Sequence, residues 1–499
     1  MRRKWFRSAA VAACWLAGCE ALYGGYAVDN SSNCMVNTAL CQVPEQACNP
    51  QTRECEPAIV LDSVDPPAAP TVGGDILTLG GQRFSPDLRV RIGGVDVANV
   101  TFVSDRSLSV AAPASPGQRG PVTVEIIHPA GQTVRRDGLF RYYEQTQLTT
   151  PQPVALAFGP RHLRSADVNR DGRLDVVMSD GFDPMIYTLL AQADGSLAEP
   201  IATTMSARPF GLALGDVNGD GKPDVAISRT GPGTAIEVAL GSGDGSFASS
   251  AVIGTQTTLG GLALGDVNSD GLADLVALDA LRLRVWLSNG DGTFAATSRD
   301  FALAYQSFGV SGRVALADLN GDAALDLVAT NGTDLSFPIF FGDGQGSFSE
   351  VPSPVFAAPP TAFAVGDTNG DGLLDVVASL GSAEPSTALM LQTAGRGFRQ
   401  PILLAGPRSA NGVEILDMNR DSVSDVVLFS PVVGTGVLSI QHAISPTRYA
   451  APKSYSLPPY PLVMLAWQRD KTQPPSLLVV HRGAGASGNF YSILSNVTP

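Results

Sequence analysis

Six nine-residue loops place acidic and amide side chains at the same spacing along the chain. Two of them read Asp216-Val-Asn-Gly-Asp-Gly-Lys-Pro-Asp224 and Asp367-Thr-Asn-Gly-Asp-Gly-Leu-Leu-Asp375. Asp, Asn, Asp and Asp stand at positions 1, 3, 5 and 9 of every loop. These side-chain oxygens, with the backbone carbonyl of position 7, make a ligand set of oxygen alone. Such a set suits a hard cation, and we expect Ca²⁺.

The spacing resembles the first three quarters of an EF-hand loop and predicts up to six calcium ions. In loop order, the candidate ligands at positions 1, 3, 5, 7 and 9 are Asp167, Asn169, Asp171, Arg173 and Asp175; Asp216, Asn218, Asp220, Lys222 and Asp224; Asp266, Asn268, Asp270, Leu272 and Asp274; Asp318, Asn320, Asp322, Ala324 and Asp326; Asp367, Asn369, Asp371, Leu373 and Asp375; and Asp417, Asn419, Asp421, Val423 and Asp425.

Three carboxylates within nine residues repel one another unless a cation lies among them. The alternative is a metal-free Asx turn, which would account for one such loop better than for six. Position 6 must bend sharply, and four loops have glycine there. Ala323 and Ser422 occupy it in the fourth and sixth loops. We therefore expect those two sites to be weaker by ~1 kcal/mol.

The loops recur every 49 to 52 residues, which predicts the architecture. In the second period a strand at 211–214 runs into the loop, a strand at 225–227 leaves it, and a third follows at 236–240. A Gly-Asp-Gly-x-Phe turn and a fourth strand complete the period. Four short strands per period of this length are typical of propeller blades. One further period reaches Ala466, where a seventh copy has lost the first acid and gained two residues.

The two ends of this region are expected to close the ring. Residues 148–158 are similar to the fourth strand of a blade, whereas residues 490–494 form the third strand of blade seven. We therefore expect the N-terminal strand to complete the last blade, which leaves no open edge. Aromatic residues of the turns are expected to pack between blades, with Leu197 in the equivalent place of blade one: Phe247, Phe294, Phe348, Phe398 and Tyr449.

The Asp-x-Asn-x-Asp-Gly-x-x-Asp loop, together with Gly290-Asp-Gly-Thr-Phe294, resembles the FG-GAP/VCBS repeat family. The resemblance covers about residues 146–499. It implies a seven-bladed propeller like that of integrin α-subunit heads, with calcium in the loops. It also implies that the main ligand surface lies on the face opposite those loops.

The N-terminus is expected to be an export signal with a lipid site. Basic residues precede a short apolar stretch that ends in Leu16-Ala17-Gly18-Cys19, which resembles a bacterial lipobox. The resemblance implies removal of residues 1–18 and lipidation of Cys19. Glu20 after the cysteine resembles proteins sent to an outer membrane. The alternatives are an ordinary secretory signal or an uncleaved anchor, although the apolar run is far below ~20 residues.

Residues 19–57 are predicted to be a tether with a cysteine-rich module. Four cysteines recur every seven residues after Cys19: Cys34, Cys41, Cys48 and Cys55. In an exported chain an even number indicates two disulfides, with three possible connectivities. A four-cysteine zinc site is the alternative, but paired Cys-x₂-Cys motifs are missing.

Residues 58–145 are predicted to be a β-sandwich, with alternating strands at 76–79, 88–92, 108–111 and 122–127. The stretch Gly73-Gly74-Asp-Ile-Leu-Thr-Leu-Gly80, followed by Val90-Arg-Ile-Gly-Gly94, resembles the IPT/TIG immunoglobulin-like domain. The resemblance implies a spacer or protein-binding role.

Composition limits the classes of partner. The formal net charge is −14, and it becomes 29 − 47 = −18 once four basic residues of the signal are removed. Nucleic acid needs a basic face, so we expect no nucleic-acid partner. The six loops hold much of the acidity, which calcium would offset.

No catalytic motif is recognisable. A Gly-x-Ser-x-Gly elbow is missing, and His128, His162, His442 and His481 are isolated in the sequence. We therefore expect a binding protein and not an enzyme. The alternative is a polysaccharide-active enzyme with carboxylates at the propeller channel. A third possibility is an envelope protein whose propeller only spaces other parts.

Ligand contacts are expected on the loops opposite the calcium loops. The candidate stretches are 229–234, 300–313, 331–338, 382–387 and 456–461. Their aromatic residues could contact protein or sugar: Phe301, Tyr305, Phe308, Phe337 and Tyr460.

The sequence therefore predicts an all-β chain: a seven-bladed β-propeller preceded by an immunoglobulin-like β-sandwich and a small disulfide-stapled segment. We expect a monomer in a bacterial cell envelope, anchored to the membrane by lipid at the outer membrane or cell surface. Its expected role is calcium-dependent binding or adhesion to a protein or glycan.

Overall fold

The computed structural model describes residues 20–23, 26–29, 46–48, 55–129 and 132–498, without the short stretches 230–233, 256, 258, 260, 280–281, 303–312, 331–334, 382–384, 394–396, 409, 432–435, 446, 468–473 and 483–487. Contacts divide the chain into two compact units, Met1–Gln145 and Thr146–Pro499. Every regular element of the described part is a β-strand, which confirms the all-β prediction. None of the described residues forms a helix of the length and hydropathy needed to cross a membrane.

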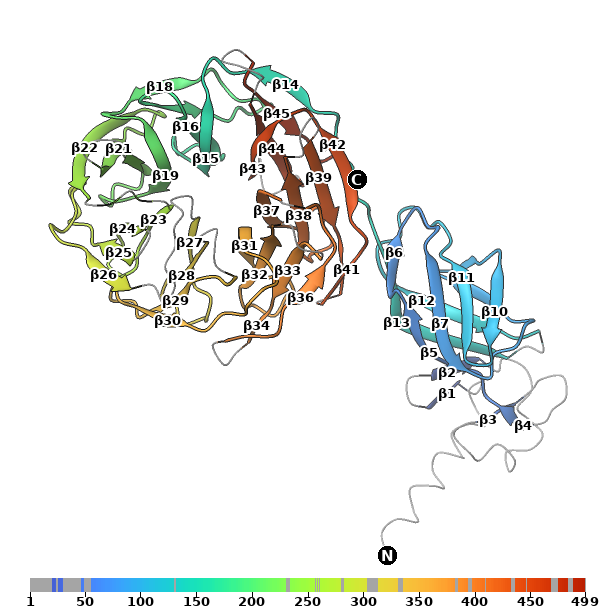
Figure 1. Ribbon diagram of the computed structural model, residues 1–499. Coiled ribbons are helices and arrows are strands. Elements are labelled where there is room, and N and C mark those ends of the chain that lie inside the picture. The colour runs from blue at the N-terminus through green and yellow to red at the C-terminus, as the bar shows by residue number, and fades with distance from the viewer. Residues whose placement is uncertain are drawn as a thin grey trace, which may run out of the picture. The chain divides into compact units, whose positions relative to one another are not determined.

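The N-terminal unit contains a sandwich of two sheets whose strands are antiparallel except for one parallel pair (Figure 1). The smaller sheet has the order β10 (Val100–Ser104), β11 (Ser107–Ala111), β7 (Ile76–Gln82) and β5 (Val60–Asp65). The larger has β1 (Glu20–Tyr23), β2 (Tyr26–Asp29), β13 (Thr133–Tyr143), β12 (Gly120–Ile127), β8 (Arg89–Ile92) and β9 (Val95–Asp96), with β6 (Ala68–Pro70) parallel to β13. The four strands predicted for the sandwich correspond to β7, β8, β11 and β12.

Alternating side chains of the two sheets make the sandwich core. Leu77 and Leu79 of β7 are fully buried and belong to one apolar cluster with Leu108, Ile126 and Phe140. This period of two is what a strand with one core-facing side requires. The immunoglobulin-like prediction is confirmed for this unit.

The segment predicted to be a tether contributes to the larger sheet. Val28 and Ala27 of β2 pair with Val134 and Arg135 of β13, because β13 is long and offers its edge to another strand. Further on, β3 (Gln46–Cys48) and β4 (Cys55–Pro57) pair with each other. The predicted signal (1–18), Cys19, Cys34 and Cys41 lie outside the described residues.

The second unit is a ring of seven four-stranded antiparallel sheets. From the first blade onward these are β15 (Pro160–Ala166), β16 (Asp175–Asp180), β17 (Met185–Leu189) and β18 (Ile201–Thr204); β19 (Pro209–Gly215), β20 (Asp224–Arg229), β21 (Ala235–Gly241) and β22 (Phe247–Gly254); β23 (Gly261–Gly265), β24 (Asp274–Leu278), β25 (Arg282–Trp286) and β26 (Arg299–Ala302); β27 (Val314–Ala317), β28 (Asp326–Ala329), β29 (Ile339–Gly342) and β30 (Phe348–Val351); β31 (Pro360–Gly366), β32 (Asp375–Leu380), β33 (Thr387–Met390) and β36 (Ile402–Leu404); β37 (Gly412–Leu416), β38 (Asp425–Ser430), β39 (Gly436–Gln441) and β42 (Lys453–Leu457); and β43 (Pro461–Trp467), β44 (Ser476–His481), β45 (Phe490–Leu494) and β14 (Gln152–Ala155).

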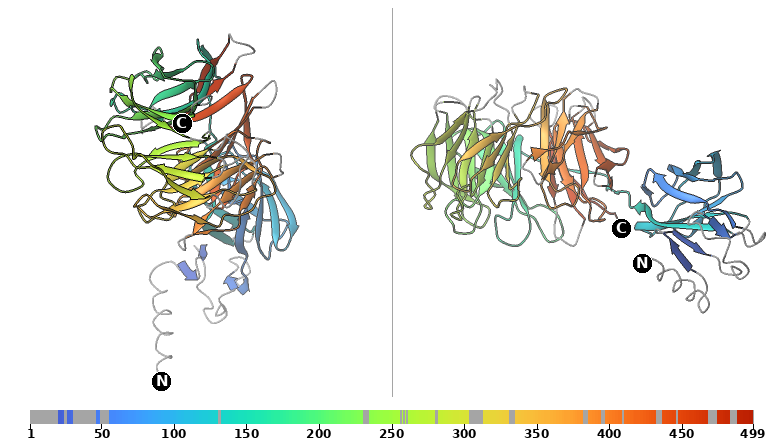
Figure 2. Two further views of the ribbon diagram at one scale, coloured as in Figure 1. Left: turned by 60° about the vertical axis from the view of Figure 1, so that its left-hand side comes forward. Right: turned by 90° about the horizontal axis from the view of Figure 1, so that it is seen from below.

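Two short ribbons extend blades five and six: β34 (Gln392–Thr393) with β35 (Gly397–Phe398), and β40 (Ala443–Ser445) with β41 (Arg448–Tyr449). The strands of each blade cross the thickness of the ring (Figure 2). The first strand of each blade is innermost (Figure 1), and each Asp loop connects it to the second strand, so all the Asp loops lie on one face of the ring.

The ring closes as predicted. β14, at the start of the unit, pairs antiparallel with β45, at its end, from Gln152 opposite Ile493 to Ala155 opposite Phe490. A further bridge joins Leu148 to Asn496. The first and last strands of the unit therefore share one blade, which closes the ring.

Apolar side chains fill the spaces between neighbouring blades. Phe247, Phe294 and Phe348 of the turns are buried, each in a cluster shared with the preceding blade. Phe398, Tyr449 and Leu197 contact the corresponding clusters of blades five, six and one. The prediction that these residues pack between blades is confirmed.

Candidate metal centres

The first Asp of each loop binds the backbone of its own loop. In the first loop, Oδ1 of Asp167 accepts the N–H of Asp171 at 3.0 Å, and Oδ2 accepts the N–H of Gly172 at 2.8 Å. The bond from position 6 to position 1 recurs in every loop, at 2.7 to 3.0 Å. The first carboxylate therefore holds the turn closed.

Positions 3 and 5 add two tight turns. Oδ1 of Asn169 accepts the N–H of Asp171 at 3.1 Å, and Oδ1 of Asp171 accepts the N–H of Arg173 at 2.9 Å. The fourth loop differs, because Nδ2 of Asn320 lies 3.3 Å from Oδ1 of Asp326. Oδ1 of Asn320 is buried and has no hydrogen-bond partner among the described residues.

Two positions of each loop adopt left-handed backbone. Position 6 has a positive φ throughout, including Ala323 at 69° and Ser422 at 67°, as the sequence predicted. Position 4 was missed by the sequence reasoning. There, Arg170, Ser269 and Arg420 also have φ between 60° and 63°. Residues with a Cβ are strained in this region, so the loop geometry itself stores some free energy.

The Asp at position 9 is fully buried and joins three parts of its blade. In the second loop, Asp224 accepts the N–H of Val217 at 2.8 Å and that of Gly241 at 2.8 Å. The first bond ties down the loop, and the second reaches the end of the third strand. All six buried Asp residues make the same two kinds of bond, at 2.7 to 3.1 Å: Asp175, Asp224, Asp274, Asp326, Asp375 and Asp425.

Family models match two regions of the chain. One, described as an FG-GAP-like repeat, matches residues 167–227, 216–277, 266–329 and 318–378. The other, the IPT/TIG domain, matches residues 59–142. The chain contains FG-GAP-like repeats and an IPT/TIG domain. No curated protein matches it.

Many solved structures are similar in fold to the chain. A periplasmic gluconolactonase from Pseudomonas aeruginosa is 15% identical, covers 74% of this chain and 96% of its own, and has a TM-score of 0.46. A lectin from Agrocybe aegerita that recognises non-reducing terminal N-acetylglucosamine is 16% identical, with 67% and 90% covered and a TM-score of 0.43. An auxiliary nutrient binding protein from Bacteroides ovatus is 12% identical, with 88% and 98% covered and a TM-score of 0.38.

Burial changes the acidity of the position-9 carboxyls in the FG-GAP-like repeats. Desolvation raises the pKa of Asp224, Asp274 and Asp326 to about 6, and hydrogen bonds from the backbone oppose the shift. Other Asp residues of the same loop raise the pKa further by repulsion. A cation in the loop would favour the ionised form of all these carboxyls.

The donor set of the loops fits Ca²⁺ chemically. Carboxylate, amide and backbone oxygens are the ligands that this ion takes, and the unpartnered Oδ1 of Asn320 is such a donor. Among the described residues, however, no three acidic, histidine or cysteine side chains are grouped closely enough to hold a metal. Position-1, position-5 and position-9 carboxylates instead accept backbone N–H groups. A carboxylate has about four lone-pair sites, so these bonds leave acceptor capacity for an ion.

Side chains at position 7 take part in two loops. Nη2 of Arg173 donates to Oδ2 of Asp171, and Nζ of Lys222 lies 3.4 Å from Oδ2 of Asp220. These half-buried cations neutralise the position-5 carboxylate, so a metal ion would compete with them. Only the backbone carbonyl of position 7 was predicted to be a ligand, and the role of these two cations was missed.

The predicted position of the seventh loop was wrong. Trp467 pairs with Ser476 in blade seven, as Ala166 pairs with Asp175 in blade one. Position 1 therefore corresponds to residue 468 and not to Ala466, and the loop has gained no residues. The error arose because the acidic residues that mark positions 1 and 9 in the other six loops are missing from this one. Ser476 takes the place of the buried Asp, and its Oγ accepts the N–H of Asn496 at 3.3 Å.

Side chains from the following blade bind the loops and were also missed. The position-2 carbonyls of Val217, Leu319 and Met418 accept hydrogen bonds from the next blade. The donors are Ser288 Oγ at 2.6 Å, Gln392 Nε2 at 2.9 Å and Asn496 Nδ2 at 2.7 Å. Each loop of these repeats is therefore held from both sides, which links loop conformation to blade packing.

The histidines are not arranged as a catalytic metal site. His442 and His481 are buried, and His481 Nε2 lies 2.8 Å from Ser492 Oγ. Desolvation lowers the pKa of His481 to about 4. His128 lies in the other unit, and His162 belongs to β15. The Ser–His pair is enclosed within blade seven and offers no surface to a substrate.

Two of the proposed aromatic ligand contacts serve the core instead. Phe337 is 2% exposed and packs edge-on against Phe356 and Phe363, so its assignment to a ligand surface is wrong. Phe301 packs against Phe348. Tyr460 is 48% exposed and remains available. Tyr305 and Phe308 lie outside the described residues.

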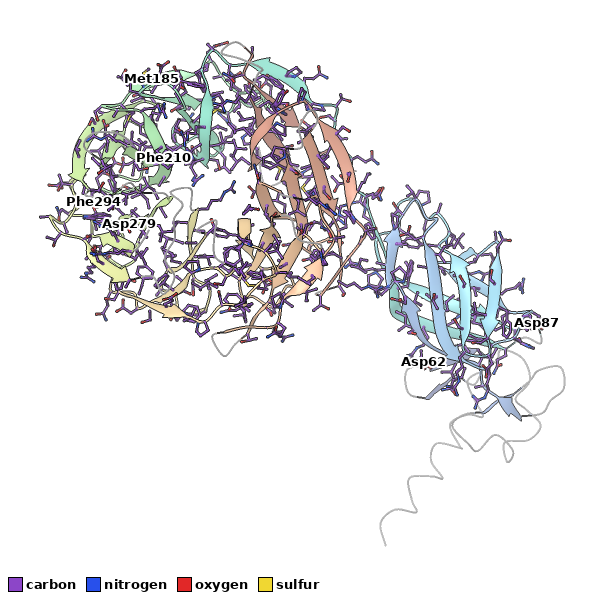
Figure 3. All side chains as sticks on the ribbon, viewed as in Figure 1. Asp62, Asp87, Met185, Phe210, Asp279 and Phe294 are labelled. Carbon is purple, nitrogen blue, oxygen red and sulfur yellow. The ribbon has the colours of Figure 1, made fainter. Side chains whose placement is uncertain are left out.

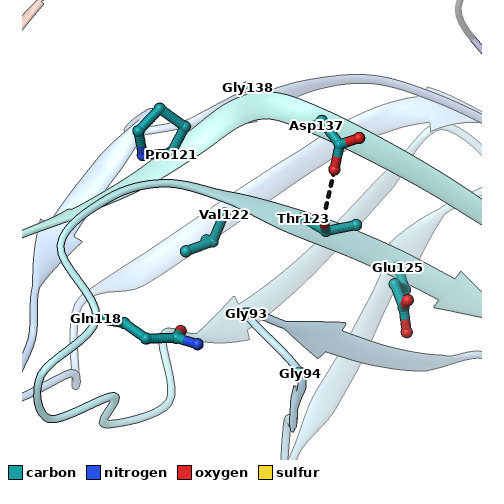
Figure 4. Close-up of a pocket in the computed structure, with 9 residues that line it drawn as sticks. All are labelled: Gly93, Gly94, Gln118, Pro121, Val122, Thr123, Glu125, Asp137 and Gly138. Carbon is teal, nitrogen blue, oxygen red and sulfur yellow. Dashed lines mark hydrogen bonds between the residues drawn. The ribbon is translucent and has the colours of Figure 1, made fainter.

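The N-terminal unit carries an open polar groove of about 510 Å³ (Figure 4). Across it, Oγ1 of Thr123 donates to Oδ1 of Asp137. Glu125 on its wall is held by Arg135 at 2.8 Å and lies 3.5 Å from Arg91. Thr123, Asp137 and Glu125 already have partners within the protein. None of these three groups is therefore left unsatisfied in the groove.

Proposed function

We propose that the chain is a calcium-binding, lipid-anchored extracytoplasmic protein that acts as a scaffold for binding or adhesion. Its ligand would be a protein or a carbohydrate at the cell surface. The observation that carries this proposal is the sixfold repetition of an all-oxygen donor set on one face of a closed ring. FG-GAP-like repeats and an IPT/TIG domain suggest a binding or scaffold protein.

Calcium would act through stability. Positions 1, 3, 5 and 9 with the position-7 carbonyl would hold the ion, and the ion would supply positive charge among like-charged carboxylates. Residues of the chain hold the loop in place without the ion. The buried Asp at position 9 bonds the loop to its own blade, and side chains of the next blade donate hydrogen bonds to the position-2 carbonyl. Binding free energy would then add to the folding free energy of the ring.

The innermost strands favour a binder over a hydrolase. Hydrolysis of glycosides generally uses two carboxylates that flank the bond. Across the seven innermost strands, all of them described, Glu414 of β37 is the one acidic residue. These seven strands therefore carry no second carboxylate for acid–base catalysis.

A thermal melt of the chain from residue 20 onward, with calcium or with chelator, tests the proposal. At free calcium of about 100 times Kd, one site adds about 2.7 kcal/mol to stability, and several sites add more. We expect a rise in Tm of several degrees and several ions per chain by titration calorimetry. The matched variant Asp220→Ala should lose one ion, whereas Asp244→Ala, in an exposed turn outside the loops, should lose none. Unchanged Tm and no bound ion would contradict the metal role.

Lipid attachment is tested separately. Cells fed a radiolabelled fatty acid should incorporate label into the natural chain but not into Cys19→Ser. A Cys14→Ser variant, altered within the predicted signal, serves as the control and should keep its label. Equal labelling of Cys19→Ser would contradict the anchor.

A further inference from the structure

Arginine side chains gather near the ring axis on the face opposite the Asp loops. β15 contributes two of them, and two more directly precede β19 and β27, at the starts of innermost strands. The fifth follows β44, next to the start of β43. We call these residues the axial arginine cluster: Arg161, Arg164, Arg208, Arg313 and Arg482. They come from four blades, although up to 321 residues separate them in sequence.

Hydrogen bonding and charge show that these side chains approach one another. Nη2 of Arg313, before blade four, donates to the carbonyl oxygen of Asn411, before blade six. Burial lowers the pKa of Arg161, and repulsion from Arg208 and then Arg482 lowers it further. Guanidinium groups from several blades therefore face a common region, and Arg313 reaches across the ring.

Negative charge in this region does not balance the cluster. Glu414 attracts Arg164 and Arg313, but no carboxylate lies within ion-pair distance of any cluster member in the described part of the chain. Arg208, Arg313 and Arg482 are exposed to solvent, although desolvation lowers the pKa of Arg313. An anion in solution can therefore reach all three side chains.

Aromatic rings lie beside the guanidinium groups. The guanidinium carbon of Arg161 is 4.3 Å from the ring centre of Phe210, a residue of β19 that is labelled in Figure 3. That of Arg482 is 5.5 Å from the ring centre of Phe182, which is 58% exposed. The backbone N–H of Arg482 also donates to the carbonyl of Tyr460 at 2.9 Å, and Tyr460 is 48% exposed. Flat apolar faces and fixed cations thus occur side by side.

We propose that the axial arginine cluster binds an acidic carbohydrate, whose carboxylate or sulfate groups pair with guanidinium groups and whose sugar rings lie against Phe182 and Tyr460. The inference rests on the proposed binding function and names its ligand class. Guanidinium matches the planar carboxylate through paired hydrogen bonds. The net charge of −14 repels long, densely charged polyanions such as nucleic acid, which favours a short or sparsely charged ligand.

Titration calorimetry on the calcium-loaded chain tests the proposal, with a galacturonate tetrasaccharide as the probe and the neutral maltotetraose as its control. We expect the acidic sugar to bind at least about tenfold more tightly, because hydrogen bonds to charged groups are worth more than neutral ones. Arg208→Ala and Arg482→Ala, both on exposed side chains, should each weaken it by about tenfold or more. Arg299→Ala, on an outer strand, should change nothing.

Each other outcome has a distinct meaning. Equal affinity for maltotetraose, or unchanged affinity in both cluster variants, overturns the arginine assignment while a carbohydrate scaffold remains. Tighter binding of a thymidine tetranucleotide or of tetraglutamate overturns the carbohydrate assignment. Absence of sugar binding in a chain that still gains Tm with calcium overturns this inference alone. Loss of both responses contradicts the proposed function as well. Melting curves of the variants separate lost contacts from lost folding.

Discussion

Nδ1 of His442 lies 3.0 Å from Oδ2 of Asp425, and both side chains are buried. Nε2 of the same ring accepts the N–H of Thr146 at 3.1 Å, so the ring proton must be on Nδ1, where it is donated to the carboxylate. The histidine therefore joins the first residue of the propeller to the sixth loop, across 296 residues of chain.

Replacing this histidine should destabilise the ring. His442→Ala leaves the buried N–H of Thr146 without this partner and removes one donor from Asp425. We expect a loss of about 2–4 kcal/mol in the free energy of unfolding, measured by urea denaturation. His128→Ala, in the N-terminal unit, is the control and should cost less than about 0.5 kcal/mol. An equally small loss for His442→Ala would show that the contact is dispensable.

A second prediction concerns the buried Asp of a repeat. Asp224→Asn replaces one acceptor oxygen with an NH₂ group that faces a backbone N–H, because both oxygens of Asp224 accept such bonds. We expect a cost of about 1–3 kcal/mol in calcium-free buffer, read from the urea midpoint. Asp244→Asn, on an exposed turn where Asp244 bonds Ser246, is the matched change. An equal loss of unfolding free energy in the two variants would contradict the role of Asp224 in holding the loop to its blade.

A third prediction concerns backbone strain at position 6. Ala323→Gly and Ser422→Gly relieve side chains held at φ of 69° and 67°, so each should stabilise the ring by about 0.5–1 kcal/mol. Differential scanning calorimetry would detect this as a higher Tm. Ala324→Gly, one residue later and outside the left-handed region, should lower the Tm instead. If all three changes lower it, the strain is not in these residues.

How much of this the sequence could predict depended on the kind of signal. Six Asp loops at a near-constant period determined the propeller, and the leftover strand at 148–158 determined its closure. The seventh repeat slipped by two residues, because Ser476 replaces the acid that marks the register. Left-handed backbone at Arg170 was missed, because glycine is the usual marker of that conformation.

Contacts between residues of different blades could not be predicted from the sequence, for a different reason. Arg313 and Asn411 belong to different blades, and no local pattern relates them. Phe337 was assigned to a ligand surface because it belongs to the candidate loop 331–338, but it lies in a cluster with Phe356 and Phe363. Burial of this kind is set by the packing of neighbouring blades, and a single repeat does not encode it.

A fourth prediction concerns the cysteines. The register of β3 and β4 places Cys48 opposite Cys55. Directly opposed residues of antiparallel strands have Cα atoms about 4.5–5.5 Å apart, which a disulfide can span. We therefore expect Cys48–Cys55 and Cys34–Cys41 bridges in the exported chain. Mass spectrometry of a non-reduced digest would identify them, and peptides that join Cys34 to Cys48 or Cys55 would exclude this connectivity.

The last prediction concerns the acidity of Glu414. Burial raises the pKa of this carboxyl to about 7, although Arg313 and Arg164 oppose the shift. It is therefore ionised at pH 8 and mostly protonated at pH 6, whereas burial and neighbouring arginines hold the pKa of His162 at about 3, which keeps it neutral. Protonation of Glu414 removes the negative charge that faces the axial arginine cluster.

Affinity for an acidic sugar should therefore rise as the pH falls through about 7, by roughly 3- to 10-fold between pH 8 and pH 6. Galacturonate stays ionised over this range, since its carboxyl titrates far lower. Glu414→Gln should bind with the higher affinity at both pH values, because the repelling charge is absent throughout. Calorimetry of both proteins at both pH values gives the comparison. A wild-type affinity that does not change with pH, or a variant that retains the full dependence, would place the titrating group elsewhere.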